Sequence, residues 1–426
     1  MTLVFTGLLS LLALMRMPLF IVIAAAACYG FYVQDVNLSV VGLEIYRITD
    51  TPLLLALPLF AFSGYLLSET RAPERLLSLT RAFFGWVPAG LPLVAFLTSA
   101  FFTAITGASG VTIVAVGALL YPALRQSGYT KDFSLGLVTS AGSLGLLLVP
   151  SMPLILYGIV VQQMDLPIQL ELTDLFIAGI GPLLLMIAML SVWSLWATRH
   201  QREATVPFSP RRVGAALWQA RWELPLPVIL LGGIYGGIVT LSEAAAMTAI
   251  YVLVIQVFLY RELPLRQLPR VVLNTCVMVG EILLILAVAL AFTNVLINAD
   301  IPTWLFEQVR GAIENRYVFL MLLNGLLLLL GALLDIFSAT IIMVPLIVPV
   351  ALSYGIDPVH LGIIFLANMQ LGYFTPPVGM NLFIAGIRFK EPMTDIYRAT
   401  WPFFLVLLAA VLLITYVPAL SLFLLK

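Results

Sequence analysis

The polar residues that could carry out chemistry lie in four short interruptions of otherwise apolar sequence. Residues 106–110 and 335–338 are expected to form the tips of two re-entrant hairpins, and residues 149–153 and 374–379 to break two helices. Helices that end inside a membrane direct backbone N–H groups at an anion and leave carbonyl oxygens free to ligate a small cation. The expected chemistry is therefore non-covalent binding of a carboxylate solute together with Na⁺.

These interruptions also have a simpler interpretation, in which small residues only let membrane helices pack closely. It applies to Gly107, Ser109 and Gly110, but it explains residues 368–381 poorly, because prolines, glycines and several amides crowd that apolar window. Unwound backbone at membrane depth is stable only where protein buries it or where it lines a wet cavity. The breaks therefore predict one enclosed site.

Three acidic residues raise separate expectations. Asp335 would cost about 2.5–3.5 kcal/mol at bilayer depth, so solute, an ion or hairpin backbone should contact it. Asp335 could also cap a helix that begins near Ile336, and the two roles are compatible. Glu243 is expected to cap the helix that follows it. For Glu281, a packing contact and a role in transport both stay open.

No motif of an enzyme is apparent in the sequence. There is no phosphate-binding glycine loop with its lysine, no metal-ligand spacing, and no G-x-S-x-G around Ser109. Cys28 and Cys276 lie far apart in apolar runs, so neither a disulfide framework nor a metal cluster is expected. The chain is therefore not expected to be an enzyme.

The amino-acid composition indicates that the chain is a membrane protein. Hydrophobic residues make up 62% of the chain and charged residues 10%, and the mean hydropathy is +1.09. Runs of about 20 apolar residues recur, which predicts an all-α polytopic protein with about a dozen membrane segments. Residues 1–33 are expected to remain as the first membrane helix. The net charge is zero and no basic stripe is present, so no nucleic-acid partner is expected.

The two halves of the chain resemble each other weakly. Residues 135–138 align with residues 361–364, and the same offset places Val149-Pro150 on Thr375-Pro376. Because breaks align with breaks, we expect two inverted repeats, each with a re-entrant hairpin and a broken helix.

Basic loops predict the orientation of the central segments. Arginines are frequent in residues 199–221 and again in residues 261–270, so both loops should face the cytoplasm. The apolar residues between them must then form a hairpin of two short spans that turns near residues 240–243. Residues 205 and 265 should consequently lie on the same side of the membrane.

Two motifs identify a resemblance to a known family. GIDPVH at residues 355–360 and N-x-x-x-G-x-x-TPPVG-x-N at residues 368–381, with ITGASG and TLSEAAA earlier, resemble the large membrane subunit of tripartite ATP-independent periplasmic (TRAP) transporters. The resemblance extends from about residue 1 to the C-terminus. It implies a Na⁺-driven elevator in the bacterial inner membrane that takes up organic acids such as sialic acid or dicarboxylates. The implied partners are a small four-helix membrane subunit and a periplasmic substrate-binding protein.

The resemblance also implies a division of the chain and a set of binding residues. The divisions are scaffold helices and an arm in residues 1–86, a first transport half in 87–198, a loop and scaffold helices in 199–316, a second transport half in 317–398, and a C-terminal helix in 399–426. The residues implied for solute are Ser109, Ser151 and Asp335. The residues implied for Na⁺ are Gly107, Ser109, Pro150 and Ser151 at one site and Asp335, Gly372, Thr375 and Gly379 at the other.

Other kinds of membrane protein stay open from the sequence. A stand-alone anion/Na⁺ symporter would use similar hairpins but would not depend on a periplasmic binding protein. In a channel or a structural subunit, the breaks would line a pore or only pack.

Overall fold

Every element of regular structure in the described part of the chain is a helix. The computed structural model describes residues 17, 19–47, 52–87, 90–164, 170–199, 208–299, 301, 304, 307–308, 313, 315–376 and 379–425. Six helical segments are long and apolar enough to cross a membrane: α10 (Leu172–Thr198), α13 with its π-helical extension η4 (Leu241–Leu259), α14 (Leu268–Asn298), α16 (Arg316–Leu333), α17 (Ile336–Ser353) and α20 (Met393–Tyr416). The chain is therefore a polytopic α-helical membrane protein, as the composition predicts.

Shorter apolar helices accompany these six. They are α2 (Leu19–Val33), α4 (Ala56–Ser68), α6 (Gly90–Thr106), α12 (Pro225–Tyr235), α18 (Pro358–Gly372) and α19 (Met380–Phe389). In addition, α8 (Lys131–Ala141) with the 3₁₀ turn η3 (Leu144–Leu147) forms a pair with α9 (Met152–Gln162) that is bent by 40° at a short break. The break falls where the sequence predicts an interrupted helix.

The two halves contain the same order of elements and contact each other reciprocally. The first half is α6, α7 (Ser109–Gln126), α8, α9 and α10, and the second is α16 to α20. Helix α8 packs on α20 while α18 packs on α10, and α7 packs on α19 while α17 packs on α9. This exchange of partners is what a pseudo-two-fold axis produces, and it supports the repeat seen in the sequence. The last long helix, α20, begins at Met393, before the boundary expected at residue 399.

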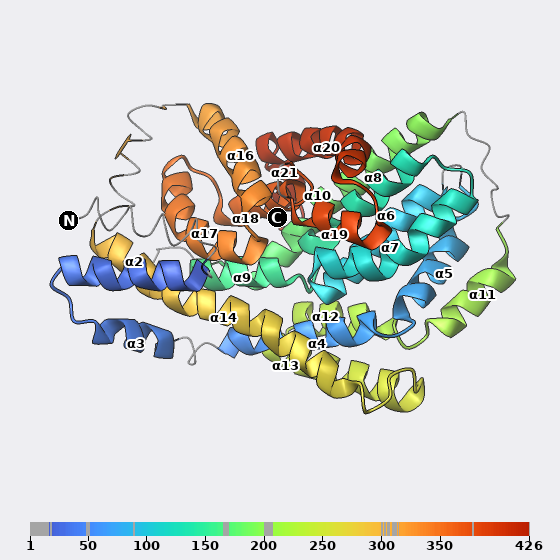
Figure 1. The fold of residues 1–426 in the computed structure, drawn as a ribbon, viewed down its shortest axis with the longest axis horizontal. Helices are drawn as coiled ribbons and strands as arrows, with labels where there is room; N and C mark the ends of the chain where they lie inside the picture. Colours follow the sequence, from blue (N-terminus) through green and yellow to red (C-terminus); the bar gives the residue numbers. More distant parts are fainter. Residues whose placement is uncertain are drawn as a thin grey trace.

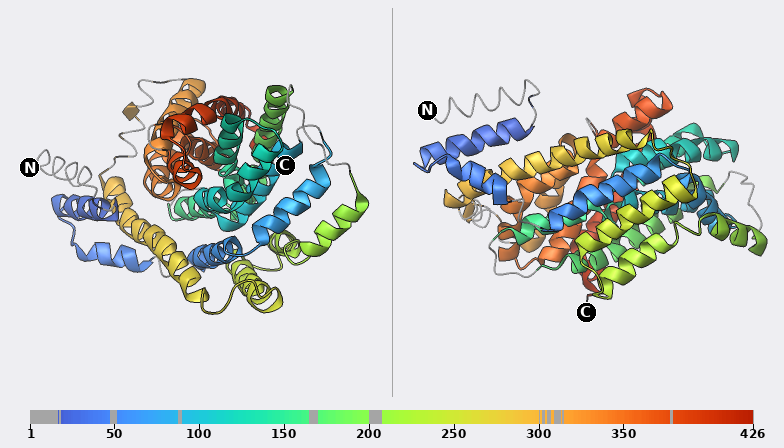
Figure 2. Two further views of the ribbon diagram at one scale, coloured as in Figure 1. Left: turned by 45° about the vertical axis from the view of Figure 1, so that its right-hand side comes forward. Right: turned by 90° about the horizontal axis from the view of Figure 1, so that it is seen from below.

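The remaining helices form an outer layer along one side of this bundle (Figures 1 and 2). It contains α2, α3 (Ser39–Arg47), α4, α5 (Ala72–Phe84), α11 (Pro210–Gln219), α12, α13 and α14. The long helix α14 packs against α2, α3 and α4, and α13 packs against α4. Two chain segments far apart in sequence, both expected to be scaffold, thus lie side by side.

The hairpin predicted between the two basic loops is present. Helices α12 and α13 pack on each other, and the turn between them contains Gly237 at φ +64°. Thr240 and Glu243 form a capping box, in which the Thr240 N–H donates to Glu243 Oε2 at 2.8 Å, so the capping role expected for Glu243 is confirmed. Residue 205 lies outside the described residues, so the shared side of residues 205 and 265 stays a prediction.

Candidate functional site

A cavity of about 800 Å³ lies where the outer layer meets the bundle. Its walls come from α4 and α14 on one side and from α7, α17 and α19 on the other. The polar residues that line it are Tyr65, Ser68, Glu69, Ser109, Glu281, Asp335, Tyr373 and Arg388. Both expected hairpin tips therefore open into one cavity, whereas the described residues of the two predicted helix breaks, 149–153 and 374–379, do not line it.

The first hairpin tip reverses direction at Gly107, whose φ of +66° suits glycine. Helix α7 begins two residues later at Ser109, a buried residue whose Oγ donates to Asn381 Oδ1 at 2.8 Å. Asn381 belongs to α19, which follows the second broken helix. One hydroxyl thus connects the tip of the first repeat to the break of the second.

The second hairpin tip is organised by Asp335. Its Oδ1 accepts hydrogen bonds from the Phe337 and Ser338 N–H groups at 2.9 Å, and its Oδ2 accepts one from Ser338 Oγ. Asp335 therefore caps α17, which confirms the predicted capping role. The same carboxylate lines the cavity, so capping does not remove it from the site.

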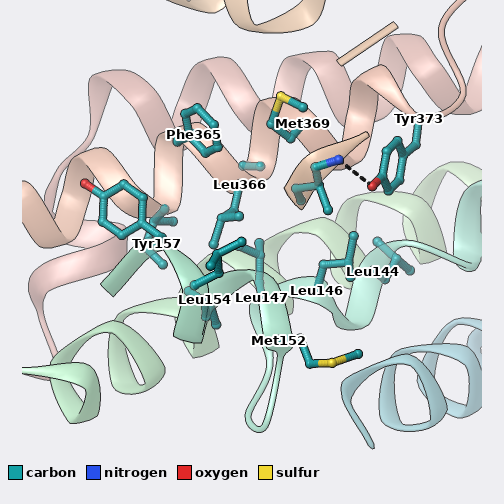
Figure 3. Packing of buried hydrophobic residues seen from close by; sticks show 14 of the residues in the cluster. Leu144, Leu146, Leu147, Met152, Leu154, Tyr157, Phe365, Leu366, Met369 and Tyr373 are labelled. Carbon is teal, nitrogen blue, oxygen red and sulfur yellow. Dashed lines mark hydrogen bonds between the residues drawn. The ribbon is translucent and has the colours of Figure 1, made fainter. Parts of the chain in front are cut away.

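Tyr373 supports this second tip from the broken helix. Its hydroxyl oxygen accepts a hydrogen bond from the Ile336 N–H at 2.8 Å, drawn as the dashed line in Figure 3. The Tyr373 carbonyl in turn accepts from the Asn381 N–H at 2.9 Å. A single buried tyrosine therefore joins the start of α17 to the start of α19.

The break in the first repeat lies behind the cavity wall. Ser151 is fully buried, and its Oγ donates to the Leu146 carbonyl at 2.6 Å. Neither Ser151 nor Pro150 is among the residues that line the cavity, whereas Leu146 is. Figure 3 shows Leu144, Leu146, Leu147 and Met152 packed in this apolar region beside α18. In this conformation the Ser151 hydroxyl bonds to a backbone carbonyl and does not face the cavity.

The other residues expected around Na⁺ are also absent from the cavity lining. Gly379, at φ +26°, donates its N–H to the Ala332 carbonyl at 3.1 Å, and Thr375 Oγ1 donates to the Leu371 carbonyl at 2.9 Å. Gly372 lies against Gly331, and a Cβ built on Gly372 would come within 2.5 Å of the Gly331 Cα. Gly372 and Gly379 thus hold the end of α16 against the end of α18 and the start of α19, whereas the Thr375 hydroxyl bonds back to α18.

Two residues of the site were not singled out from the sequence. Arg388 lines the cavity from the last turn of α19, and its Nε donates to the Val114 carbonyl on α7 at 3.2 Å. Asn381 is fully buried and bonds to Ser109. A sequence signal for Arg388 existed, since it is the one charged residue in an apolar helix that directly follows TPPVG. Glu281, left open above, lines the cavity from α14.

A family model matches nearly the whole chain. It is described as "Tripartite ATP-independent periplasmic transporter, DctM component" and matches residues 6–420. The C4-dicarboxylate TRAP transporter large permease protein DctM of Rhodobacter capsulatus is 35% identical over 430 residues, which cover 99% of this chain and 98% of that protein. The isethionate TRAP transporter permease protein DctMQ of Oleidesulfovibrio alaskensis is 34% identical over 87% of this chain and 58% of its own length.

The fold is similar to that of a solved transporter. The crystal structure of the Alcanivorax borkumensis YdaH transporter superposes with a TM-score of 0.58, over 87% of this chain and 88% of that one. At 16% sequence identity the likeness concerns the fold alone.

The Gly331–Gly372 contact gives a test of how α16 and α18 support the site. Gly372→Ala should lower the melting temperature, because the new methyl group would collide with backbone that cannot move aside without separating the two helices. Overpacking of this kind costs about 1–3 kcal/mol. The measurement is thermal unfolding of the purified protein in detergent.

Gly325→Ala is the matched control, since it lies on α16 with nothing within 4 Å of the added Cβ. This change should be neutral or stabilise the helix by up to about 1 kcal/mol. Equal melting temperatures for the two variants would contradict the role assigned to the contact.

Proposed function

Because the chain belongs to the DctM family of tripartite ATP-independent periplasmic transporters, we propose that it is the translocating subunit of a Na⁺-coupled uptake system for small organic acids. Members of this family are large permease subunits of transporters and not enzymes. The observation that carries the solute class is the cavity between the two hairpin tips. Within it, Arg388 is the only basic residue among the described lining residues.

Arg388 supports an acidic solute through its geometry. Its Nε donates to the Val114 carbonyl at 3.2 Å, which links the exposed guanidinium to the first hairpin, and no hydrogen bond from its terminal N–H groups is found among the described residues. Such a fork binds a carboxylate or sulfonate through two parallel hydrogen bonds. The start of α7 at Ser109 adds an N-terminal helix dipole that favours the same negative charge.

The proposed coupling ion is Na⁺, held by oxygen atoms of the breaks. Among the described residues there is no group of three or more His, Cys, Asp and Glu side chains that could hold a metal. Hydroxyl, carbonyl and carboxylate oxygens are the donors that a hard monovalent cation requires at broken helices. One ion would lie near Gly107, Ser109, Pro150 and Ser151. The other would lie near Asp335, Gly372, Thr375 and Gly379.

The proposed mechanism is an elevator in a protein with about a dozen membrane segments in two inverted repeats. The halves α6–α10 and α16–α20 exchange packing partners and share the Ser109–Asn381 bond, so they are joined firmly enough to move as one body. The outer layer, with α4 and α14, supplies the opposite wall of the cavity. Movement of the bundle past this wall would carry the solute across the membrane.

The proposed partners follow from the family. They are a small four-helix membrane subunit and a periplasmic substrate-binding protein, and the location is the bacterial inner membrane. The two relatives described above are named for C4-dicarboxylates and isethionate, which are both organic anions. We propose C4-dicarboxylates as the first solutes to test, followed by isethionate and sialic acid.

Uptake into proteoliposomes tests this function. The chain and its small subunit should accumulate labelled dicarboxylate only with both an inward Na⁺ gradient and the binding protein present. Uptake that needs Na⁺ but no binding protein would instead indicate a stand-alone symporter. Unsaturable flux without a gradient, from a folded sample, would indicate a channel.

The Asp335→Asn variant distinguishes the two roles of Asp335, because it removes the negative charge and keeps the helix cap at the second hairpin tip. Asparagine accepts the same helix N-cap hydrogen bonds, so the melting temperature should change little. Na⁺-driven uptake should fall at least about tenfold, because the carboxylate proposed to bind the ion is gone. Unchanged uptake would contradict an ion-binding role. So would a less than twofold rise in the Na⁺ concentration that gives half the maximal uptake rate.

Arg388→Gln tests the anchor for the acid group. Loss of a charge-assisted pair of hydrogen bonds, about 1.5–3 kcal/mol, should raise the half-saturating solute concentration roughly tenfold or more. Arg388→Lys should recover part of this loss, because it keeps the charge but not the fork. Lys390→Gln, two residues further along and outside the cavity lining, is the control that should leave uptake unchanged. A similar loss in both glutamine variants would contradict the assignment.

A further inference from the structure

Another hollow, which shares no lining residue with the transport cavity, lies between α5 and α11 of the outer layer. Its volume is about 430 Å³. The residues that line it are Ser78, Arg81, Ala82, Ser209, Arg212, Ala215, Ala216 and Gln219. We call it the α5–α11 groove. It carries two guanidinium groups, and no acidic side chain is among its described lining residues.

The floor of the groove is apolar and its rim is basic. Leu79, Ala216 and Ala220 are buried together where the two helices meet. Arg81 and Arg212 are exposed, and neither forms an ion pair within the described part of the chain. Unlike Arg75 on the same helix, which is paired with Glu223 and Glu262, these two arginines have unneutralised charge beside an apolar surface.

The surroundings have the properties of a membrane–water interface. Trp86 and Trp218 are 51% and 69% exposed, and the Trp86 ring meets that of Phe208 edge to face at 6.2 Å. The guanidinium of Arg221 lies 4.5 Å from the centre of the Trp218 ring. Exposed tryptophans and arginines on a short amphipathic helix are typical of the head-group level of a bilayer. In Figure 2, α11 lies at the outer rim of the molecule, beside α5.

We propose that the α5–α11 groove binds the phosphate head group of an anionic membrane phospholipid. Arg81 and Arg212 would hold the phosphate from the two helices, with the Ser78 and Ser209 hydroxyls and the Gln219 amide as further donors. The acyl chains would stay in the bilayer beside the apolar floor. A lipid is favoured over a free anion because α11 follows α10, which is long enough to cross a membrane, and precedes the apolar helix α12. This position at the end of a membrane-crossing helix fits head-group depth.

The groove also lies in the arginine-rich region that the positive-inside rule assigns to the cytoplasmic face. Each basic residue near an anionic membrane surface contributes about 1 kcal/mol to binding, so two arginines should give a roughly thirtyfold preference for an anionic lipid. This inference concerns the outer layer only and does not depend on which solute is transported.

The test measures lipid binding directly. The purified chain is placed in phosphatidylcholine nanodiscs that contain increasing fractions of phosphatidylglycerol, and bound lipid is counted by native mass spectrometry after release from the nanodisc. The wild type should retain phosphatidylglycerol selectively. The double variant Arg81→Gln/Arg212→Gln should bind it roughly thirtyfold more weakly. Both residues are exposed, so the melting temperature should be unchanged.

A matched double variant controls for net charge. Arg211→Gln/Arg266→Gln removes two exposed arginines outside the groove and should weaken binding less than about threefold. Equal weakening in both double variants would overturn the proposal in favour of diffuse attraction. Equal retention of phosphatidylcholine would overturn it, and so would displacement of the lipid by excess inorganic phosphate, which would indicate a site for a free anion.

Discussion

The need to satisfy every backbone polar group at membrane depth governs this structure. Four breaks remove the partners that a continuous helix would give to backbone N–H and C=O groups, and each group left unsatisfied at membrane depth would cost several kcal/mol. Groups from other elements supply the missing partners. The Ile336 N–H donates to the Tyr373 hydroxyl, the Gly379 N–H to the Ala332 carbonyl, and the Leu146 carbonyl accepts from Ser151 Oγ. The breaks persist because these partners are buried beside them.

Some of these hydrogen bonds join the two repeats, and others join a hairpin to a broken helix. Ser109 in the first repeat donates to Asn381 in the second, and Tyr373 connects the starts of α17 and α19. The wall behind the cavity is consequently a continuous network of buried hydrogen bonds and close glycine contacts. The opposite wall consists of side chains from α4 and α14, among them the carboxylates Glu69 and Glu281.

In the outer layer, charged residues are stabilised by ion pairs with one another or lie at the exposed rim. Arg75 forms ion pairs with Glu223 and Glu262, and Tyr260 stacks on its guanidinium at 4.0 Å. Because both carboxylates are largely buried, this cluster joins α5 to the start of α12 and to the end of η4 without exposing an uncompensated charge. Within the described ranges, Arg81 and Arg212 have no such partners and lie at the rim instead, where water and lipid head groups can solvate them.

The sequence by itself determined the membrane class, the positions of the four breaks, the capping roles of Asp335 and Glu243, and the family. These depend on local composition and spacing, which a single chain displays directly. Only the tertiary structure decided which residues face the cavity. Ser109, Asp335, Glu281 and Arg388 line the cavity, whereas Ser151, Gly372, Thr375 and Gly379 do not. The reason is physical: the orientation of a side chain on a broken helix depends on which distant group satisfies the broken backbone, and sequence spacing does not specify that partner.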